Sequence, residues 1–257
     1  MNILVIGDLV GEGGVKKLKE CLPTLKQQYA IDFMVVNAEN AAGGMGITKR
    51  IFQELKDMQV PCITMGNHTW GKKDIFELID DPILLRPANY SRGVVGKGYH
   101  IYEVKNKKIA VINAIGRTDM GIQSENPFLV VNDIVESLQG KVDSILVDFH
   151  AEATAEKIAM KYYLDGRVTA VWGTHTHVQT ADEEITANGT AYITDVGMTG
   201  PKRAIIGMDV QVALKRFLTS LPERYKLAEG DCMLNGCVIG VKEENGQAES
   251  IQRIFLK

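Results

Sequence analysis

The sequence predicts an α/β protein whose sheet is largely parallel, with some antiparallel strands. Apolar, strand-like runs recur along the chain and alternate with segments of helical period, a pattern typical of parallel strands joined by helices. The early runs are apolar throughout, as strands are when helices cover both faces of their sheet. Two pairs of runs are joined by short polar turns, which indicates hairpins and therefore a mixed sheet or a second sheet packed on the first.

The strand-like runs are predicted to be 2–8, 32–39, 61–66, 99–105, 108–115, 143–149, 168–173, 190–195, 232–241 and 249–256. One hairpin is expected to turn around Asn106-Lys107, and the other around residues 243–247. No Pro- or Ser-rich linker, internal repeat or low-complexity tract divides the chain. We therefore expect a single domain over residues 1–257.

The helices are indicated by apolar residues three and four apart. In the first helix these are Val15, Leu18, Leu22, Leu25 and Tyr29. Pro23 interrupts this pattern, so we expect either a kinked helix or two short helices. Thr48 is expected to cap a helix over 49–59. Further helices are predicted at 72–79, 128–139, 152–164 and 209–218.

Composition restricts the classes of partner. The net charge is −3 and the pI is about 6.0, so the chain has no general attraction to nucleic acid or to anionic membranes. No apolar run approaches the ~20 residues that span a bilayer, the amino terminus lacks the pattern of a signal peptide, and the four cysteines show no C-x-x-C spacing. We expect a cytoplasmic protein without a membrane or stable nucleic-acid partner. The sequence does not determine its oligomeric state and leaves a homo-oligomer open.

Polar side chains of one chemical kind end five of the strand-like runs. They are Asp8, Glu39, Asn40, Asn67, His68, His150, His175 and His177. The carboxyl ends of neighbouring strands in an open α/β sheet face a common crevice, where ligands bind. Carboxylate, amide and imidazole groups are donors that transition metals prefer. The sequence therefore predicts a site for two metal ions, and such a site is typical of a phosphoesterase.

Spacing suggests a role for some of these side chains. His175 and His177 are two residues apart, so in an extended segment both point to the same side, toward one ion or two adjacent ions. Asn67 can offer its carbonyl oxygen to an ion. His68 is adjacent and points elsewhere, so we expect it to donate a proton to a leaving oxygen or to contact a phosphoryl oxygen. Glu39 could bridge two cations with its two oxygens.

Each signal also has a purely structural interpretation. Asp8 could cap the following helix, Asn67 could close a turn through its own backbone, and His150 could be a histidine buried in the core. His100 lies in a strand-like run without polar neighbours, and we assign it no role. The joint pattern favours the metal site, because five separate strand ends would otherwise have to imitate one.

These residues resemble the calcineurin-like metallophosphoesterases, which carry an Asp motif, a bridging acid, Gly-Asn-His, a lone His and Gly-His-x-His in that order. More narrowly, the chain is similar to the bacterial YmdB family in the segments 37–42, 64–70, 148–154, 173–182 and 194–201. Two features depart from the wider superfamily. Leu9 and Val10 follow Asp8 where Asp-x-His is usual, and the bridging acid is Glu39 in place of Asp.

The resemblance implies a fold of two mixed β-sheets packed as a sandwich and flanked by helices. It also implies two metal ions, iron or manganese, with zinc equally suited to the donors. One ion would be held by Asp8, Glu39, Asn40 and His177. The other would be held by Glu39, Asn67, His150 and His175.

The activity that the resemblance implies is hydrolysis of a small phosphodiester. In the family, cyclic nucleotides are cleaved, 2′,3′-cyclic ones prominently, and 3′,5′-cyclic ones stay open. A bridging water deprotonated by the two cations would be the nucleophile, and His68 would protonate the leaving ribose oxygen. The residues by themselves support only metal-dependent phosphoester hydrolysis.

Two other functions remain as alternatives. The first is a regulatory metal-binding protein with weak or vestigial phosphoesterase activity. The second is a nucleotide-binding oxidoreductase, suggested by Gly11-Glu12-Gly13-Gly14, but Lys16 stands where the third glycine of G-x-G-x-x-G belongs. We expect these glycines to form a tight turn beside the metals. For the base of a nucleotide, Asn113, Arg117 and the loop 195–201 could line a pocket or could be structural.

Overall fold

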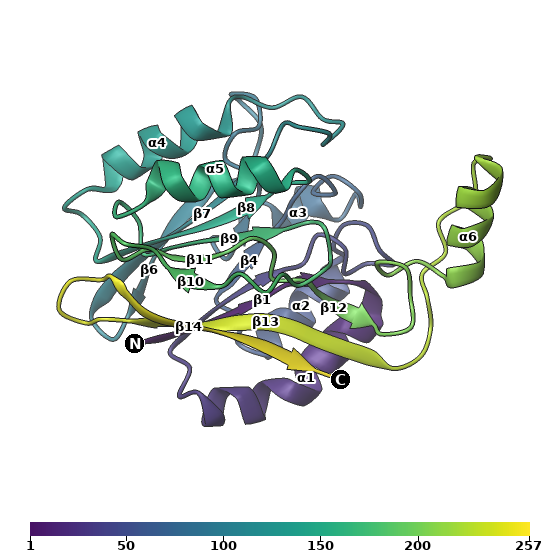
Figure 1. The fold of residues 1–257 in the computed structure, drawn as a ribbon, viewed down its shortest axis with the longest axis horizontal. Helices are drawn as coiled ribbons and strands as arrows, with labels where there is room; N and C mark the ends of the chain where they lie inside the picture. The colour runs from purple at the N-terminus through teal and green to yellow at the C-terminus, as the bar shows by residue number, and fades with distance from the viewer.

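The computed structural model describes residues 1–257, which form two mixed β-sheets packed face to face, with helices on their outer faces (Figure 1). The first sheet has the order β2-β12-β13-β1-β3-β4-β5, with β14 paired to β13. Its strands are β1 (Asn2–Ile6), β2 (Asp8–Leu9), β3 (Phe33–Asn37), β4 (Cys62–Thr64), β5 (Leu84–Leu85), β12 (Met198–Pro201), β13 (Cys232–Val241) and β14 (Ala248–Leu256). From β1 to β5 the pairing is parallel, and β13 runs antiparallel to β1.

The second sheet has the order β10-β11-β9-β8-β7-β6. Its strands are β6 (Tyr99–Val104), β7 (Lys107–Ile115), β8 (Ser144–His150), β9 (Ala170–Thr174), β10 (Glu184–Ile185) and β11 (Ala191–Ile193). The central strands β7, β8, β9 and β11 are parallel, and both outer strands are antiparallel to their neighbours. The predicted mixture of parallel strands and hairpins is therefore confirmed, in two sheets.

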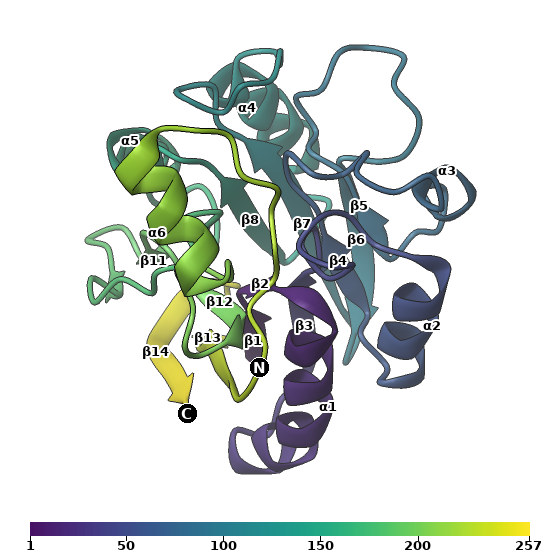
Figure 2. The ribbon, with the colours of Figure 1, turned by 90° about the vertical axis from the view of Figure 1, so that its right-hand side faces the viewer.

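The helices are α1 (Gly11–Gln28), α2 (Lys49–Asp57), α3 (Ile75–Leu78), α4 (Pro127–Leu138), α5 (Thr154–Leu164) and α6 (Val210–Thr219). Helices α1 and α2 pack on the first sheet, and α4 and α5 pack on the second. Helix α6 stands away from the two sheets and faces the viewer in Figure 2. No helix is both long and apolar enough to cross a membrane.

Alternation along each strand explains the layers. Ile3 and Val5 of β1 point into the core between the sheets, and Leu4 and Ile6 point into the core beneath α1 and α2. Successive side chains of a strand face opposite sides, so a strand buried on both sides is apolar throughout. This is why the early runs are uniformly apolar.

The first helix differs from its prediction. It is one continuous helix with Pro23 inside it, so the division into two short helices is wrong. Leu22 and Leu25 are buried on either side of the proline, and their packing outweighs the lost backbone hydrogen bond. The glycines from Gly11 to Gly14 form the first turn of this helix and not a separate tight turn. A Cβ on Gly14 would meet the carbonyl oxygen of Thr199 in β12, so the glycine allows the helix to approach that strand.

Two local predictions are confirmed. Thr48 is the N-cap of α2, and its hydroxyl accepts a hydrogen bond from the backbone of Ile51. The β6–β7 hairpin turns through Lys105 and Asn106, both with positive φ. The predicted helix 72–79 is shorter than expected, because only Ile75–Leu78 is α-helical. Strands β2, β5, β10 and β12 were not expected.

Candidate metal centre and active site

The structure brings the eight predicted site residues to one edge of the sandwich. Asp8 lies in β2, and Glu39, Asn40, Asn67 and His68 follow β3 and β4 of the first sheet. The histidines come from the second sheet: His150 ends β8, and His175 and His177 follow β9. The site is therefore assembled from the carboxyl ends of strands in both sheets.

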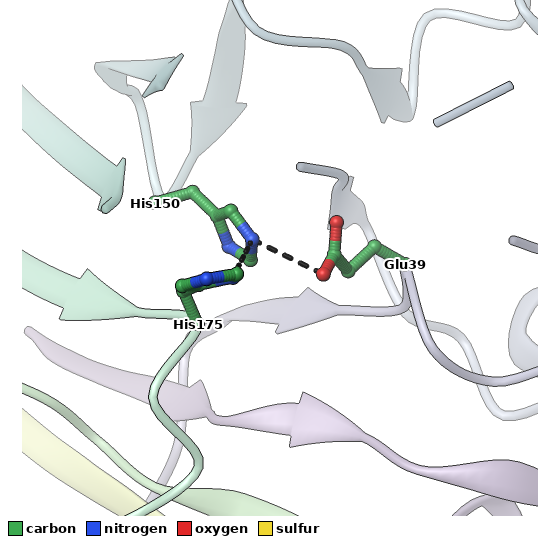
Figure 3. A group of neighbouring side chains, drawn as sticks. All are labelled: Glu39, His150 and His175. Atoms are coloured by element: carbon green, nitrogen blue, oxygen red, sulfur yellow. Dashed lines mark hydrogen bonds and ion pairs between the residues drawn. The ribbon is translucent and has the colours of Figure 1, made fainter. Parts of the chain in front are cut away.

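Four of these side chains converge on a single point. The Nε2 atom of His150 lies 3.1 Å from Glu39 Oε1, 2.9 Å from Asn67 Oδ1 and 3.1 Å from His175 Nδ1. Figure 3 shows Glu39, His150 and His175 pointing toward one another. Neighbouring ligands of an octahedral ion with bonds of about 2.1 Å lie about 3 Å apart. These four donors therefore have a spacing that a metal ion can bridge, and Glu39, His150 and His175 satisfy the geometry of a three-ligand cluster.

The remaining residues lie beside this group. The amide nitrogen of Asn40 is 3.1 Å from Glu39 Oε1 and 3.1 Å from His177 Nε2. To act as a metal ligand, the Asn40 amide must be turned over, so that its oxygen lies where its nitrogen now lies. His177 also contacts the carbonyl oxygen of Ile206 through Nδ1, at 2.8 Å.

Asp8 is a buried carboxylate that is only partly satisfied. Its Oδ2 accepts a hydrogen bond from the backbone of His175 at 3.1 Å, and its Oδ1 has no hydrogen-bond partner. Helix α1 is capped by Val10 without a side-chain hydrogen bond, so the alternative in which Asp8 caps that helix is wrong. A buried oxygen without a partner is costly unless a cation or donor occupies its free side. This orphaned oxygen fits a bound metal ion.

A second layer of residues orients His150. Its Nδ1 lies 2.9 Å from the Thr174 hydroxyl, which in turn donates to the Asp148 carboxylate at 2.8 Å. Thr64 donates to the other oxygen of Asp148. Such contacts fix the orientation of a ligating ring and turn its Nε2 toward the site. Sequence reasoning missed this layer, although a buried acid two residues before the histidine was its signal.

The loop that carries His175 and His177 is not extended, as had been expected. Strand β9 ends at Thr174, and both histidines have positive φ, 99° and 65°. Asp195 holds this conformation, because its Oδ2 accepts hydrogen bonds from the backbone and the hydroxyl of Thr176 at 3.1 and 2.7 Å. The sequence did not identify this role of Asp195.

Burial and mutual charge shift the titration of the site. Burial raises the pKa of Glu39, but the charge of His150 outweighs it and lowers that pKa to about 2. Burial lowers the pKa of His150, but Glu39 and the nearby carboxylates outweigh it and raise that pKa to about 9. Burial raises the pKa of Asp8 to about 6, and burial with the neighbouring His150 lowers the pKa of His175 to about 3. Without an ion, His150 is therefore the protonated partner of Glu39.

His68 lies at the border between this group and solvent. Its Nδ1 is 2.7 Å from Asn40 Oδ1, its backbone donates to Glu39 Oε2 at 3.0 Å, and its side chain is 33% exposed. Burial lowers its pKa, so the ring is neutral at neutral pH. His68 also lines a cleft of about 450 Å³, together with Glu39, Asn40, His175 and His177.

Other candidate residues lie elsewhere. Asn113 is fully buried, and its amide donates to the carbonyl oxygens of Met65 and Leu85, so it joins the two sheets and does not line the cleft. Arg117 and the segment 195–201 do not line the cleft either. His100 packs against Tyr102 in β6, away from the site.

Comparison with known proteins agrees with this geometry. The model of the YmdB-like protein family matches residues 4–254. The chain is 49% identical, over 100% of its length and 97% of the relative, to a 2′,3′-cyclic-nucleotide 2′-phosphodiesterase of Bacillus subtilis (strain 168). The crystal structure of a novel phosphatase from Mycoplasma pneumoniae is 35% identical and has a TM-score of 0.95, covering 100% of this chain and 93% of that chain.

More distant structures share the fold alone. A 5′-nucleotidase precursor from Thermus thermophilus has a TM-score of 0.57 at 10% identity, and it is covered over 54% of its length by 100% of this chain. The predicted calcineurin-like fold, with two mixed sheets in a sandwich, is confirmed. The motifs at the strand ends also led to the correct family: the chain belongs to the YmdB-like proteins.

Proposed function

We propose that this protein is a metal-dependent phosphodiesterase that hydrolyses 2′,3′-cyclic nucleotides. The observation that carries the proposal is the convergence of Glu39, Asn67 and His175 on Nε2 of His150 at 2.9–3.1 Å, beside a cleft that His68 lines. The chain is a hydrolase of phosphoric ester bonds, as its phosphodiesterase and phosphatase relatives are. The 2′,3′-cyclic substrate is proposed because the relative at 49% identity is named for it.

The donor set fits two divalent ions. Glu39, Asn67, His150 and His175 would hold one, and Asp8, Glu39, Asn40 and His177 would hold the other. When bound, such ions polarise the phosphoryl group and lower the pKa of water, so that a nucleophile is available at neutral pH. Iron and manganese are the proposed metals, and zinc suits the same donors.

His68 is proposed to protonate the leaving ribose oxygen. A neutral ring can donate from Nε2 only if Nδ1 accepts a hydrogen bond. When the Asn40 amide turns its oxygen toward the metal donors, its nitrogen faces Nδ1 of His68, now 2.7 Å from Asn40 Oδ1. One orientation of Asn40 therefore serves both the metal and the acid. Cleavage of a 2′,3′-cyclic diester at the 2′ oxygen then leaves a nucleoside 3′-phosphate.

The alternative of a regulatory protein with vestigial activity is not favoured by the residues present. Every position expected to donate carries a competent oxygen or nitrogen, and the donors are within contact of one another. Hydrolysis of 3′,5′-cyclic nucleotides stays open, because nothing in the cleft selects between the two rings. The single domain, the cytoplasmic location and a homo-oligomer stay predictions.

The proposal is tested by comparing the wild type with Glu39→Gln. Hydrolysis of bis-p-nitrophenyl phosphate and of 2′,3′-cyclic AMP should be measured with added manganese, and bound metal should be measured by elemental analysis. Glu39→Gln should lose metal and activity by at least a hundredfold, because Glu39 belongs to both proposed ion sites. The exposed Glu54→Gln, in α2, should match the wild type. Equal rates for Glu39→Gln and wild type would refute the proposed function.

A further inference from the structure

The cleft beside the metal donors has a wall that the two sheets do not supply. This wall comes from residues 205–225, the segment that includes α6, and its main side chains are Ile206, Met208, Arg216, Phe217 and Tyr225. Figure 2 shows α6 in front of the ends of β1, β12 and β13. At about 450 Å³, the cleft has the size of a site for one small molecule.

The wall is fixed to the candidate metal ligands. His177 contacts the carbonyl oxygen of Ile206 through Nδ1 at 2.8 Å. Met208 forms bridges with Ile205 and Leu227, and Asp209 caps α6 through the backbone of Gln211 and Val212. The segment is therefore held at its base by the sandwich, and its position relative to the donors is set by hydrogen bonds.

Tyr225 is placed against the loop that carries the proposed ligands. A Cβ on Gly44 would lie 2.6 Å from the Tyr225 ring, and the backbone nitrogen of Gly44 donates to the carbonyl oxygen of Asn40 at 3.1 Å. The missing side chain and the positive φ of Gly44 thus allow the ring to reach this loop. The Tyr225 hydroxyl makes no hydrogen bond within the protein, so it is free to bind a ligand.

Phe217 and Arg216 complete the wall. Phe217 lines the cleft and is 75% exposed, which is unusual for an aromatic side chain without a partner. Arg216 is the one Lys or Arg that lines the cleft, and it has no ion pair. An anionic, planar ligand would match both features, since aromatic faces stack on nucleobases and guanidinium groups bind phosphates.

We propose that Phe217 and Tyr225 bind the base of the nucleotide substrate, with Arg216 facing its phosphate-bearing part. This inference rests on the proposed function and names the part of the cleft that distinguishes a nucleotide from a simple phosphodiester. The metal donors hold the phosphate at one end of the cleft, and the aromatic side chains receive the flat base at the other. Sequence reasoning had considered Asn113, Arg117 and 195–201 for this role, and none of them lines the cleft.

The test compares a substrate that has a base with one that lacks it. Phe217→Ala and Tyr225→Leu are assayed with 2′,3′-cyclic AMP and with glycerol 1,2-cyclic phosphate, which has the same five-membered cyclic diester without a base. For each variant, the ratio of kcat/KM for the nucleotide over the base-free diester should fall about tenfold, mainly through KM. The dissociation constant of adenosine 3′-phosphate, measured by calorimetry, should rise by a similar factor.

The matched control is Leu218→Ala, the neighbour of Phe217, which is 82% exposed and does not line the cleft. Its ratio and its dissociation constant should equal those of the wild type. An unchanged ratio and constant in the Phe217 and Tyr225 variants of an active enzyme would overturn the base site alone. If size-exclusion shows instead that Phe217→Ala changes the oligomeric state with no change in the ratio, the ring belongs to an interface between copies, and the base site is equally overturned. A wild type that cleaves neither diester would overturn the proposed function.

Discussion

Lys157 donates a hydrogen bond of 2.7 Å to Oδ2 of Asp195, and both side chains are buried. The same carboxylate oxygen accepts hydrogen bonds from the backbone and the hydroxyl of Thr176. Its other oxygen accepts from the backbone of Gly197 at 2.8 Å. One ion pair thus joins α5 to the loop that carries His175 and His177, and it supports a backbone with positive φ at both histidines.

Asp195→Asn should destabilise the protein by about 3–5 kcal/mol, because it leaves the buried ammonium group of Lys157 without a counter charge. Urea unfolding measures this change. Glu184→Gln is the matched control, since Glu184 accepts from Lys161 of the same helix at the same 2.7 Å but is 48% exposed. An exposed pair of this kind contributes less than about 1 kcal/mol. Equal costs for the two substitutions would show that burial of the Lys157 pair has no energetic consequence.

Gly66→Ala should abolish binding of metal while leaving the chain folded. A Cβ on Gly66 would overlap the imidazole of His150 and the carboxylate of Glu39, and both are buried and cannot retreat together. Elemental analysis and circular dichroism measure the two effects. Gly13→Ala is the control, because its Cβ would meet only Cys232 Sγ, at 2.8 Å, in the first turn of α1. Normal metal content in Gly66→Ala would contradict the proposed donor set.

His68→Ala should lower kcat by about 10²–10⁴-fold and leave the metal content unchanged, because its ring is assigned to proton transfer and not to coordination. Steady-state kinetics and elemental analysis separate the two. The effect should be smaller for a diester with a good leaving group, such as bis-p-nitrophenyl phosphate, which needs no proton donor. Loss of metal in this variant would instead make His68 a ligand.

Binding of manganese to the apoprotein, prepared by chelation, should release about one proton per chain at pH 7.5. The neighbouring carboxylates raise the pKa of His150 to about 9 against the opposing effect of burial, so its ring is protonated there and must lose the proton to bind an ion. Calorimetry in two buffers of different ionisation enthalpy measures the release. The release should fall as the pH is raised toward 9. An apparent enthalpy that is independent of the buffer would show that His150 is already neutral.

Much of the fold could be predicted because it depends on patterns that span many residues. The uniformly apolar β1 and β3 and the two hairpins each repeat a simple rule over five residues or more. Strands such as β2 and β5 contain two residues each, too few to show any period, and they form only because a neighbouring strand offers hydrogen bonds. Pro23 remained inside a helix for the same reason: packing decided what local propensity left open.

The site was predictable to the extent that its residues end strands. Glu39 and His150 follow apolar runs, and the carboxyl ends of strands converge in this class of fold. Asp195 and Thr174 act through partners distant in sequence, so no spacing in the chain reveals them. The positive φ of His175 follows from the loop as a whole, because a non-glycine residue gives no local sign of it. The wall of α6 was missed since its residues resemble an ordinary amphipathic helix.

The two sheets contribute unequally to the donors, and this has a consequence for turnover of the chain. Glu39 follows a strand of the first sheet and His150 ends a strand of the second, so an ion bound between them would cross the interface of the sandwich. Ligands that bind only the folded chain shift its unfolding equilibrium by mass action. The lifetime of the chain against intracellular proteases would then follow the supply of metal, and starvation for that metal would remove the protein as well as its activity.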